Sequence, residues 1–239
     1  MKAGYFLIAD VLGFSNIVTN STPEVLETRV DEWVSMARGG AAEARIREVM
    51  LVSDTVFAAV DETPDGLGRL VNYGRHLLEA GIAQSLPIRG AISHGEFQWG
   101  SLTYGPAVVA AHAIERAQDW IGIACSNQMP HVKEMWGFDR LVCYPAPLRS
   151  GPIRLCPVVS WNVPRFRALV GHMCRGGLTQ EEDLVPWEWE RKLTNTALFG
   201  TYCRLLAQAK GSPEYFHGLF PMDEIDYHLF GRADETVAS

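Results

Sequence analysis

The chain has 239 residues, of which 47% are hydrophobic and 21% charged, values that suit a globular protein with a substantial core. Its formal net charge of −7 argues against nucleic acid or an anionic membrane as a partner, because both attract basic faces. No apolar run reaches the ~18 residues of a membrane span, and Asp10 comes too early for a signal peptide. The five cysteines are scattered and odd in number, which favours reduced thiols and a cytoplasmic protein.

The first predicted elements are a strand and a helix. The apolar run 5–11 contains Asp10 near its end and leads into a glycine turn, as a buried strand does when it feeds a loop. Thr22-Pro23-Glu24 predicts a helix start, with threonine as the cap and proline at the first position. We expect this helix to end at Gly39-Gly40.

A β-hairpin and a series of shorter elements follow. The runs 47–52 and 55–60 are apolar and flank the polar pair Ser53-Asp54, which predicts a hairpin with this pair at its tip. Asp65 is expected to cap the next helix. The remaining predicted elements are a strand over 86–93 paired with 95–100 as a second hairpin, a helix over 107–117, a strand over 121–125, a short helix over 127–135, strands over 140–144 and 153–161, and a helix over 187–210.

This alternation predicts an α+β fold in which helices pack on one mixed or mainly antiparallel sheet. Three prolines and Gly151 cluster between residues 145 and 152 and mark the best candidate boundary. We therefore divide the chain into a core over 1–145 and a C-terminal extension over 146–239. We expect the extension to add a strand and helix that pack on the core, and not to fold as an independent domain.

Two aspartates are the candidate site. If the first strand lies beside the hairpin, Asp10 and Asp54 project from one end of the sheet, where they repel each other unless a cation lies between them. Carboxylate oxygens suit Mg²⁺ or Mn²⁺, which also bind phosphate oxygens. Gly13 allows the backbone after Asp10 to approach a phosphate closely. Taken singly, Asp10 is also explained as a helix cap or a surface turn residue, and Asp54 is more simply explained as an ordinary turn residue.

Four blocks in this order resemble the catalytic domain of class III nucleotidyl cyclases: IADVLGFS (8–15), VSDTV (52–56), PIRGAISHGE (87–96) and GPAVV (105–109). The resemblance covers roughly residues 4–145. Within that superfamily, the Ser-Asp-Thr turn and the Gly-Pro-Ala helix start are most similar to the Pycsar pyrimidine nucleotide cyclases of bacterial anti-phage defence. The resemblance to class III cyclases implies a ferredoxin-like cyclase sandwich and a homodimer with two shared active sites.

The resemblance also implies roles for individual residues. Asp10 and Asp54 match two aspartates that bind two Mn²⁺ or Mg²⁺ ions, and Val11 would add its backbone carbonyl. Met50 and Tyr104 fall at positions that face the base from the other subunit. The loop that holds the triphosphate by its main chain corresponds to Leu12, Gly13, Phe14 and Ser15.

The departures from the family pattern bear on the substrate. The two base-reading positions of purine cyclases fall near Met50 and Leu102, and neither side chain reads a purine edge by hydrogen bonds. This favours a pyrimidine, and we prefer UTP to CTP, although no residue decides between them.

The transition-state residues of the family are also replaced. Its Asn and Arg fall near Val109 and Ala113, so another cation has to stabilise the developing charge. We expect this cation to come from one of four side chains: Arg116, Arg89, or, from the C-terminal region, Lys192 or Arg191. Asn195 and Thr196 are weaker candidates for contacts with the nucleotide.

The sequence therefore favours a cyclase that converts UTP into the 3′,5′-cyclic nucleotide and pyrophosphate, a second messenger for antiviral defence that a separate effector protein reads. Two alternatives stay open. One is an adenylate or guanylate cyclase with unusual base readers. The other is a catalytically degenerate cyclase fold that binds a nucleotide as a sensor.

Overall fold

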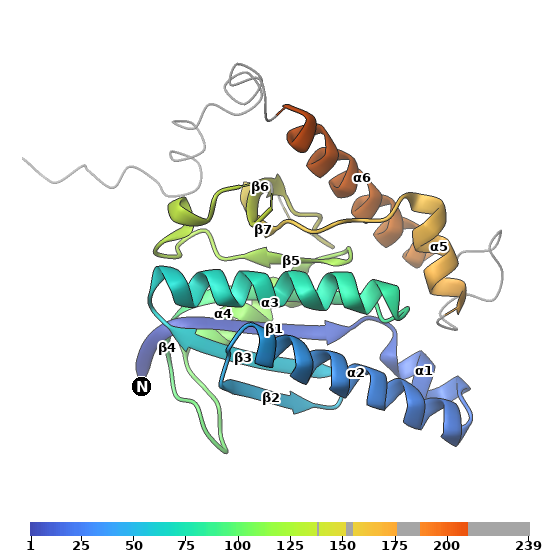
Figure 1. Ribbon diagram of the computed structural model, residues 1–239, viewed down its shortest axis with the longest axis horizontal. Helices are drawn as coiled ribbons and strands as arrows, with labels where there is room; N and C mark the ends of the chain where they lie inside the picture. The colour runs from blue at the N-terminus through green and yellow to red at the C-terminus, as the bar shows by residue number, and fades with distance from the viewer. Residues whose placement is uncertain (138, 152–154, 176–186, 210–239) are drawn as a thin grey trace, which may run out of the picture.

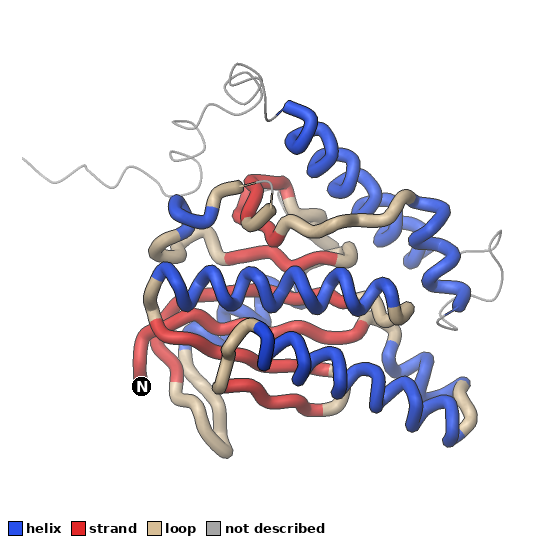
Figure 2. The backbone as a smooth tube through the Cα atoms, viewed as in Figure 1, coloured by secondary structure: helices blue, strands red, loops and turns tan. Residues whose placement is uncertain are grey.

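The computed structural model describes residues 1–137, 139–151, 155–175 and 187–209. Within these residues the centre of the molecule is one sheet of seven strands in the order β2-β3-β1-β4-β5-β7-β6 (Figures 1 and 2). The strands are β1 (Lys2–Val11), β2 (Glu48–Val52), β3 (Thr55–Asp61), β4 (Ile88–Phe97), β5 (Gly122–Cys125), β6 (Leu141–Pro145) and β7 (Leu155–Val159). Neighbouring strands run antiparallel except β4 and β5, so the predicted α+β fold with a mainly antiparallel sheet is confirmed.

Helices cover both faces of this sheet. They are α1 (Phe14–Asn20), α2 (Pro23–Glu43), α3 (Pro64–Ala83), α4 (Pro106–Ala117), α5 (Phe166–Arg175) and α6 (Trp187–Ala209), with one 3₁₀ turn, η1 (Val132–Met135). In Figure 1, α2 and α3 lie in front of the sheet and α4 behind it. The helix α3 packs on β1, β3 and β4, whereas α4 packs on the opposite face of β1, β4 and β5.

The central strand β1 faces a core on each side, which explains its continuous apolar run. Leu7 and Ala9 belong to the large core beneath α2 and α3, which also contains Trp33. Phe6 and Ile8 point the other way, into a smaller apolar cluster beneath α4. Since successive residues of a strand alternate between faces, Asp10 lies on the α4 side of the sheet.

Two predictions at the helix ends are wrong. The helix α2 continues through Gly39 and Gly40 to Glu43. Gly40 is buried where α2 meets α3, and a Cβ there would collide with the ring of His76, so this glycine serves close helix packing. The cap of α3 is Thr63, whose hydroxyl accepts a hydrogen bond from the Gly66 amide at 2.9 Å, and not Asp65.

The predicted second hairpin is also wrong. β4 is one strand that pairs with β1 along its whole length, from Ile88 opposite Val11 to Phe97 opposite Lys2. Gly95 has a φ of +148°, which glycine adopts readily, and it continues the strand. The short helix predicted over 127–135 is reduced to the turn η1.

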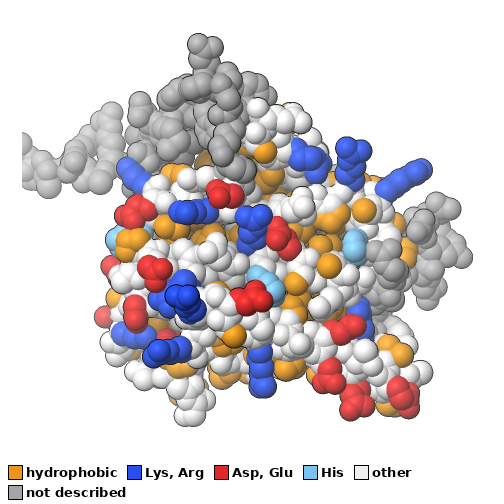
Figure 3. Space-filling view, in the orientation of Figure 1, with side chains coloured by type: hydrophobic (Ala, Val, Ile, Leu, Met, Phe, Trp, Pro, Cys, Tyr) orange, Lys and Arg blue, Asp and Glu red, His pale blue; other side chains and the backbone are white. Residues whose placement is uncertain are grey.

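The region after residue 145 extends the same sheet. β7 lies between β5 and β6 and pairs with both of them. The helix α6 packs its Phe199 ring against Trp120 and Tyr144, each at 4.9 Å between ring centroids. Within the described residues, no helix is both long and apolar enough to cross a membrane. On the face seen in Figure 3, acidic and basic side chains are interspersed.

Candidate active site

The two predicted aspartates lie at the same edge of the sheet, Asp10 near the end of β1 and Asp54 in the turn that leads into the neighbouring strand β3. Asp10 is near the end of β1 and pairs in register with Thr55 of β3, directly after Asp54 in the β2–β3 turn. The Val11 amide donates a hydrogen bond to the Asp54 carbonyl at 3.1 Å, which fixes this turn beside the end of β1. The condition for two neighbouring carboxylates, that β1 lies beside the hairpin, is therefore met.

A buried ion pair lies on the other side of Asp10. Arg89 is opposite Asp10 in the register of β1 and β4, and its Nη2 is 3.5 Å from Asp10 Oδ2. Arg89 Nε donates to Glu115 Oε1 of α4 at 2.6 Å, and Nη2 forms an ion pair with the same oxygen. Arg89 is only 6% exposed and Glu115 only 4%, so both charges are nearly removed from solvent.

Two polar atoms of this cluster are buried without a hydrogen-bond partner among the described residues: Asp10 Oδ1 and Arg89 Nη1. Leaving such atoms unsatisfied costs free energy, so both atoms are available to a ligand or to water. A carboxylate oxygen suits a hard cation, and a guanidinium N–H suits a phosphate oxygen.

The carboxylates of Asp10 and Asp54 fit Mg²⁺ or Mn²⁺, but two side chains do not complete the coordination of such an ion. Among the described residues, no three His, Cys, Asp or Glu side chains gather so that they could hold a metal ion. A divalent ion beside Asp10 and Asp54 would therefore take further oxygens from the main chain, water or a substrate phosphate, as Mg²⁺ commonly does.

The surroundings of Asp10 also alter its acidity. Burial raises the pKa of the Asp10 carboxyl to about 7, and the negative charges of Glu115 and Asp54 raise it further, while the Arg89 guanidinium opposes the shift. A divalent cation would reverse this shift by favouring the ionised carboxylate.

The predicted phosphate loop directly follows Asp10. Leu12 and Phe14 are buried and anchor the loop, and the Leu12 amide donates to the Pro87 carbonyl at 2.8 Å. Gly13 has a φ of +78° and precedes α1, where the amides of Asn16 and Ile17 donate to its carbonyl. Ser15 is exposed. The loop is therefore held beside Asp10, with the Leu12 amide already used within the protein.

The predicted base-facing residues do not join this cluster. Tyr104 pairs with Gln98 beyond the end of β4, about 30 Å along the strand direction from Arg89. Met50 lies on β2 opposite Phe57, on the α4 side of the sheet. Exposed apolar side chains on this part of the molecule include Leu102 at 71%, Tyr104 at 51% and Val109 at 69% exposure.

Of the four candidate cations, only Arg89 contacts Asp10. Arg116 is exposed on α4 and has no ion pair with any described residue, and Ala113 is exposed as well. Arg191 and Lys192 both pair with Asp119, which is 2% exposed, the Lys192 contact being 3.4 Å. In this structure Arg191 and Lys192, two of the four alternatives, are thus engaged by Asp119 and not by the aspartates.

Asn195 and Thr196 dock α6 onto the sheet region. Asn195 Nδ2 donates to the Asp119 carbonyl at 2.9 Å, and the Ile121 amide donates to the Thr196 hydroxyl at 2.9 Å. Both side chains are accounted for by this docking. Glu115, in contrast, was missed by the sequence reasoning; its signal was an acid at four-residue spacing from the buried Ala107 and Ala111 on one helix face.

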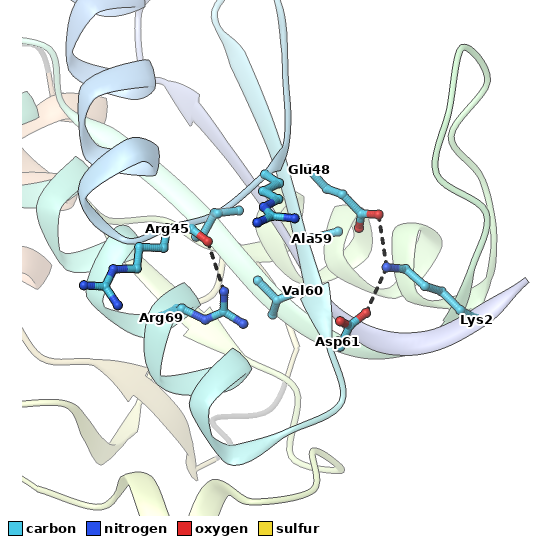
Figure 4. Close-up of a pocket in the computed structure, with 9 residues that line it drawn as sticks. Lys2, Arg45, Glu48, Ala59, Val60, Asp61 and Arg69 are labelled. Carbon is cyan, nitrogen blue, oxygen red and sulfur yellow. Dashed lines mark hydrogen bonds and ion pairs between the residues drawn. The ribbon is translucent and has the colours of Figure 1, made fainter.

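A separate pocket of about 380 Å³ opens at the other end of β1 (Figure 4). There Lys2 forms ion pairs of 3.0 Å with Glu48 and with Asp61, while Arg69 Nη1 donates to the Arg45 carbonyl at 3.0 Å. Lys2 is about 25 Å along β1 from Asp10, so this pocket shares no side chain with the aspartate cluster.

Comparisons with known proteins identify the fold. No protein-family model matches the chain, and no curated protein matches it. Solved structures do match. The chain is 16% identical to a non-canonical dimeric guanylyl cyclase domain of the RhoGC fusion protein from the aquatic fungus Blastocladiella emersonii, with a TM-score of 0.55 over 67% of this chain and 97% of that one.

Two further structures agree. The catalytic core of a rhodopsin-guanylyl cyclase with converted specificity, in complex with ATPalphaS, is 15% identical with a TM-score of 0.52 over 66% of this chain and 96% of that one. The adenylyl cyclase CyaB from P. aeruginosa is 15% identical with a TM-score of 0.51 over 66% and 94%. The sheet that carries Asp10, Asp54 and Arg89 thus has the fold of class III nucleotidyl cyclase domains.

Proposed function

We propose that this protein is a nucleotide cyclase that converts a pyrimidine nucleoside triphosphate, UTP in preference to CTP, into its 3′,5′-cyclic monophosphate and pyrophosphate. The observation that carries the proposal is the unpartnered, buried Oδ1 of Asp10 beside Asp54, at the loop end of β1. It is supported by the fold, since the similar structures are named as guanylyl and adenylyl cyclases.

In the proposed reaction the ribose 3′-oxygen attacks the α-phosphorus, and the bond from that phosphorus to the pyrophosphate oxygen breaks. Mn²⁺ or Mg²⁺ held by Asp10, Asp54 and the Val11 carbonyl would lower the pKa of the 3′-hydroxyl and offset the negative charge of the phosphates. Arg89 would donate its unpartnered Nη1 to a phosphate oxygen, where charge develops. The main chain of the loop from Leu12 to Ser15 would orient the triphosphate.

The preference for a pyrimidine rests on what the base-facing positions lack. Met50 and Leu102 offer no hydrogen bond that would recognise a purine edge. The matched structures are named as guanylyl or adenylyl cyclases, so the nature of the base is the part of the proposal that most needs an assay.

The proposal extends to the assembly and the pathway. The exposed apolar side chains of Leu102, Tyr104 and Val109 support a homodimer in which each active site takes its base-facing residues from the second subunit. The cyclic product would be read in the cytoplasm by a separate cyclic-nucleotide-binding effector of antiviral defence, which rests on the resemblance of the four sequence blocks to Pycsar cyclases.

The direct test incubates the purified protein with Mn²⁺ and each of the four nucleoside triphosphates separately, with product identified by chromatography. We expect cyclic UMP as the main product. Asp54→Ala should lower the rate by roughly 100- to 1,000-fold, because it removes a carboxylate that counters charge in the transition state. Asp31→Ala, an exposed aspartate of α2, is the matched control and should keep full activity.

Each other outcome points to one alternative. Product from ATP or GTP alone would establish a purine cyclase. Nucleotide binding with no cyclic product from any triphosphate would establish the sensor function, which the apolar Val109 and Ala113 favour. Undiminished turnover by Asp54→Ala would remove the aspartate pair from the mechanism.

A further inference from the structure

Glu115 is an acid on the buried face of a helix. Its neighbours on the same face of α4, Ala107 and Ala111, are fully buried, and Glu115 itself is 4% exposed. A carboxylate in such a place requires compensation by charge and hydrogen bonds. Glu115 Oε1 accepts a hydrogen bond from Arg89 Nε and forms an ion pair with Nη2, while Oε2 lies 3.8 Å from Nδ1 of the exposed His112.

The contacts of Arg89 are unequal. Its Nε and Nη2 both engage Glu115 Oε1, the Nε bond being 2.6 Å. The contact of Nη2 with Asp10 Oδ2 is 3.5 Å, longer than the ~2.7–2.9 Å of a strong charge-assisted hydrogen bond. Glu115 and Asp10 thus compete for one guanidinium, and Glu115 holds it.

This competition leaves both ligand-facing atoms free. With Nε and Nη2 engaged by Glu115, Arg89 Nη1 has no hydrogen-bond partner among the described residues, and neither has Asp10 Oδ1. If the guanidinium turned to pair fully with Asp10, it would neutralise that carboxylate and compete with a metal ion for its oxygens.

We propose that Glu115 is a positioning residue: it holds the Arg89 guanidinium away from a full pair with Asp10, so that Asp10 remains available to a divalent cation and Arg89 Nη1 to a phosphate. This rests on the proposed function for the identity of the ligands. It adds a residue that contacts neither ligand and acts through its hold on Arg89 and through its own charge beside Asp10.

The charges of the cluster give the proposal a direction. When ionised, the carboxylates of Asp10, Asp54 and Glu115 together with the guanidinium of Arg89 leave two negative charges, which match one divalent cation. Glu115→Gln removes one of these charges and also releases Arg89 toward Asp10, and both effects weaken cation binding. Glu115→Asp keeps the charge but shortens the side chain by one methylene, so it loosens the hold on Arg89 while the charge of the cluster stays the same.

The test measures Mn²⁺ binding to the nucleotide-free protein by calorimetry, with folding followed by circular dichroism. For a residue that orients a metal ligand from outside the coordination shell, we expect both variants to weaken Mn²⁺ binding by roughly 10- to 100-fold. The double variant Arg89→Gln with Glu115→Gln keeps the cluster charge and leaves no guanidinium to turn, so its Mn²⁺ affinity should return to near that of the wild type.

Glu32→Gln is the matched control, because Glu32 forms an Arg–Glu pair of 2.8 Å with Arg29 on α2 and is paired with neither Asp10 nor Arg89. It should leave Mn²⁺ binding unchanged. Unaltered Mn²⁺ affinity in Glu115→Asp would overturn the positioning role. The same would follow if Glu115→Gln and the double variant Arg89→Gln with Glu115→Gln weakened Mn²⁺ binding equally.

Folding and the proposed function are tested separately. If Glu115→Gln does not fold, the comparison of Glu115→Asp with the double variant decides the question. If the wild-type protein binds Mn²⁺ but makes no cyclic product, the positioning role of Glu115 stands and the proposed cyclase activity is contradicted. A wild-type protein that binds no Mn²⁺ overturns both.

Discussion

Folding and metal binding favour opposite protonation states of Asp10. Burial in the fold favours the protonated carboxyl, while a metal ion needs it ionised. Burial raises its pKa to about 7, and the nearby Glu115 and Asp54 add to the effect against the attraction of Arg89. The folded, metal-free protein therefore prefers the protonated carboxyl over a range in which an unfolded chain would ionise it.

The contribution of Asp10 to stability without metal should consequently fall as the pH rises. Because the pKa is raised on folding, the contribution of Asp10 is fully present below about pH 4 and is lost progressively as the pH rises through about 7. With about 1.4 kcal/mol for each pKa unit, the ionised carboxylate costs the metal-free fold a few kcal/mol at pH 8. Denaturant unfolding in EDTA between pH 4 and 8 measures this loss.

Asp10→Asn should remove most of that pH dependence, since its amide does not ionise, whereas Asp31→Asn should behave as the wild type. Saturating Mn²⁺ should reverse the trend for the wild type and for Asp31→Asn but not for Asp10→Asn, because metal binding requires the ionised carboxylate and strengthens as the pH rises. A wild-type curve that stays parallel to that of Asp10→Asn would contradict the raised pKa.

Individual site residues differed in how far the sequence could predict them. Asp10 and Asp54 follow from strand and turn patterns, which are local, and the hairpin that carries Asp54 in its turn pairs with β1 as expected. Arg191 was a plausible active-site cation until its contact with Asp119, a residue 72 positions away, was known. Glu115 was overlooked for the same reason, because its meaning depends on Arg89 across the sheet.

At the scale of elements, local signals and tertiary packing disagree mainly at glycines. The Thr22 cap and the Ser53-Asp54 turn are set by neighbouring residues, and both were predicted correctly. The end of α2 was not, because Gly40 marks contact with α3 and not a helix end. A glycine signals a break and a close approach equally, and only the partner element decides which applies.

Two helical glycines should therefore respond oppositely to alanine. Gly39 of α2 is exposed and a Cβ there would meet nothing within 4 Å, so Gly39→Ala should stabilise the protein by about 0.5–1 kcal/mol through helix propensity. Gly81 of α3 is buried, and a Cβ there would lie 2.6 Å from the Leu86 carbonyl oxygen, so Gly81→Ala should destabilise by about 1–3 kcal/mol.

Denaturant unfolding of the two variants at one pH measures both changes, and each variant serves as the control for the other. The same gain in both would show that propensity alone governs these helices. A loss in Gly39→Ala would contradict its open surroundings.

At the scale of the whole molecule, the strand β7, which follows residue 145, is built into the sheet. β7 separates β5 from β6, so β6 reaches the rest of the sheet only through a strand of the extension. The helix α6 is then attached by the Asp119 ion pairs and by the ring of Phe199. The sequence located this strand and helix, but their order in the sheet depends on pairing between distant segments, which periodicity does not reveal.

The proposed dimer with shared sites can be tested by complementation between two inactive variants. If one subunit supplies Asp54 and the other supplies Tyr104 to each site, two inactive variants complement each other. Asp54→Ala removes a metal ligand. Tyr104→Arg places a cation at a half-exposed base-facing position, where it should block turnover without disturbing the core. In a mixed dimer of these two chains, one site carries both changes and the other carries neither.

After subunit exchange, half of the dimers are mixed and half of their sites are intact, so the mixture should recover about a quarter of the wild-type activity. Cyclic nucleotide formation by each variant alone and by the mixture provides the measurement, and sedimentation establishes the dimer independently. Activity absent from the mixture, while sedimentation shows that mixed dimers form, would place each complete site within one subunit. In that case Tyr104, about 30 Å along the sheet from Arg89, would have no part in the reaction.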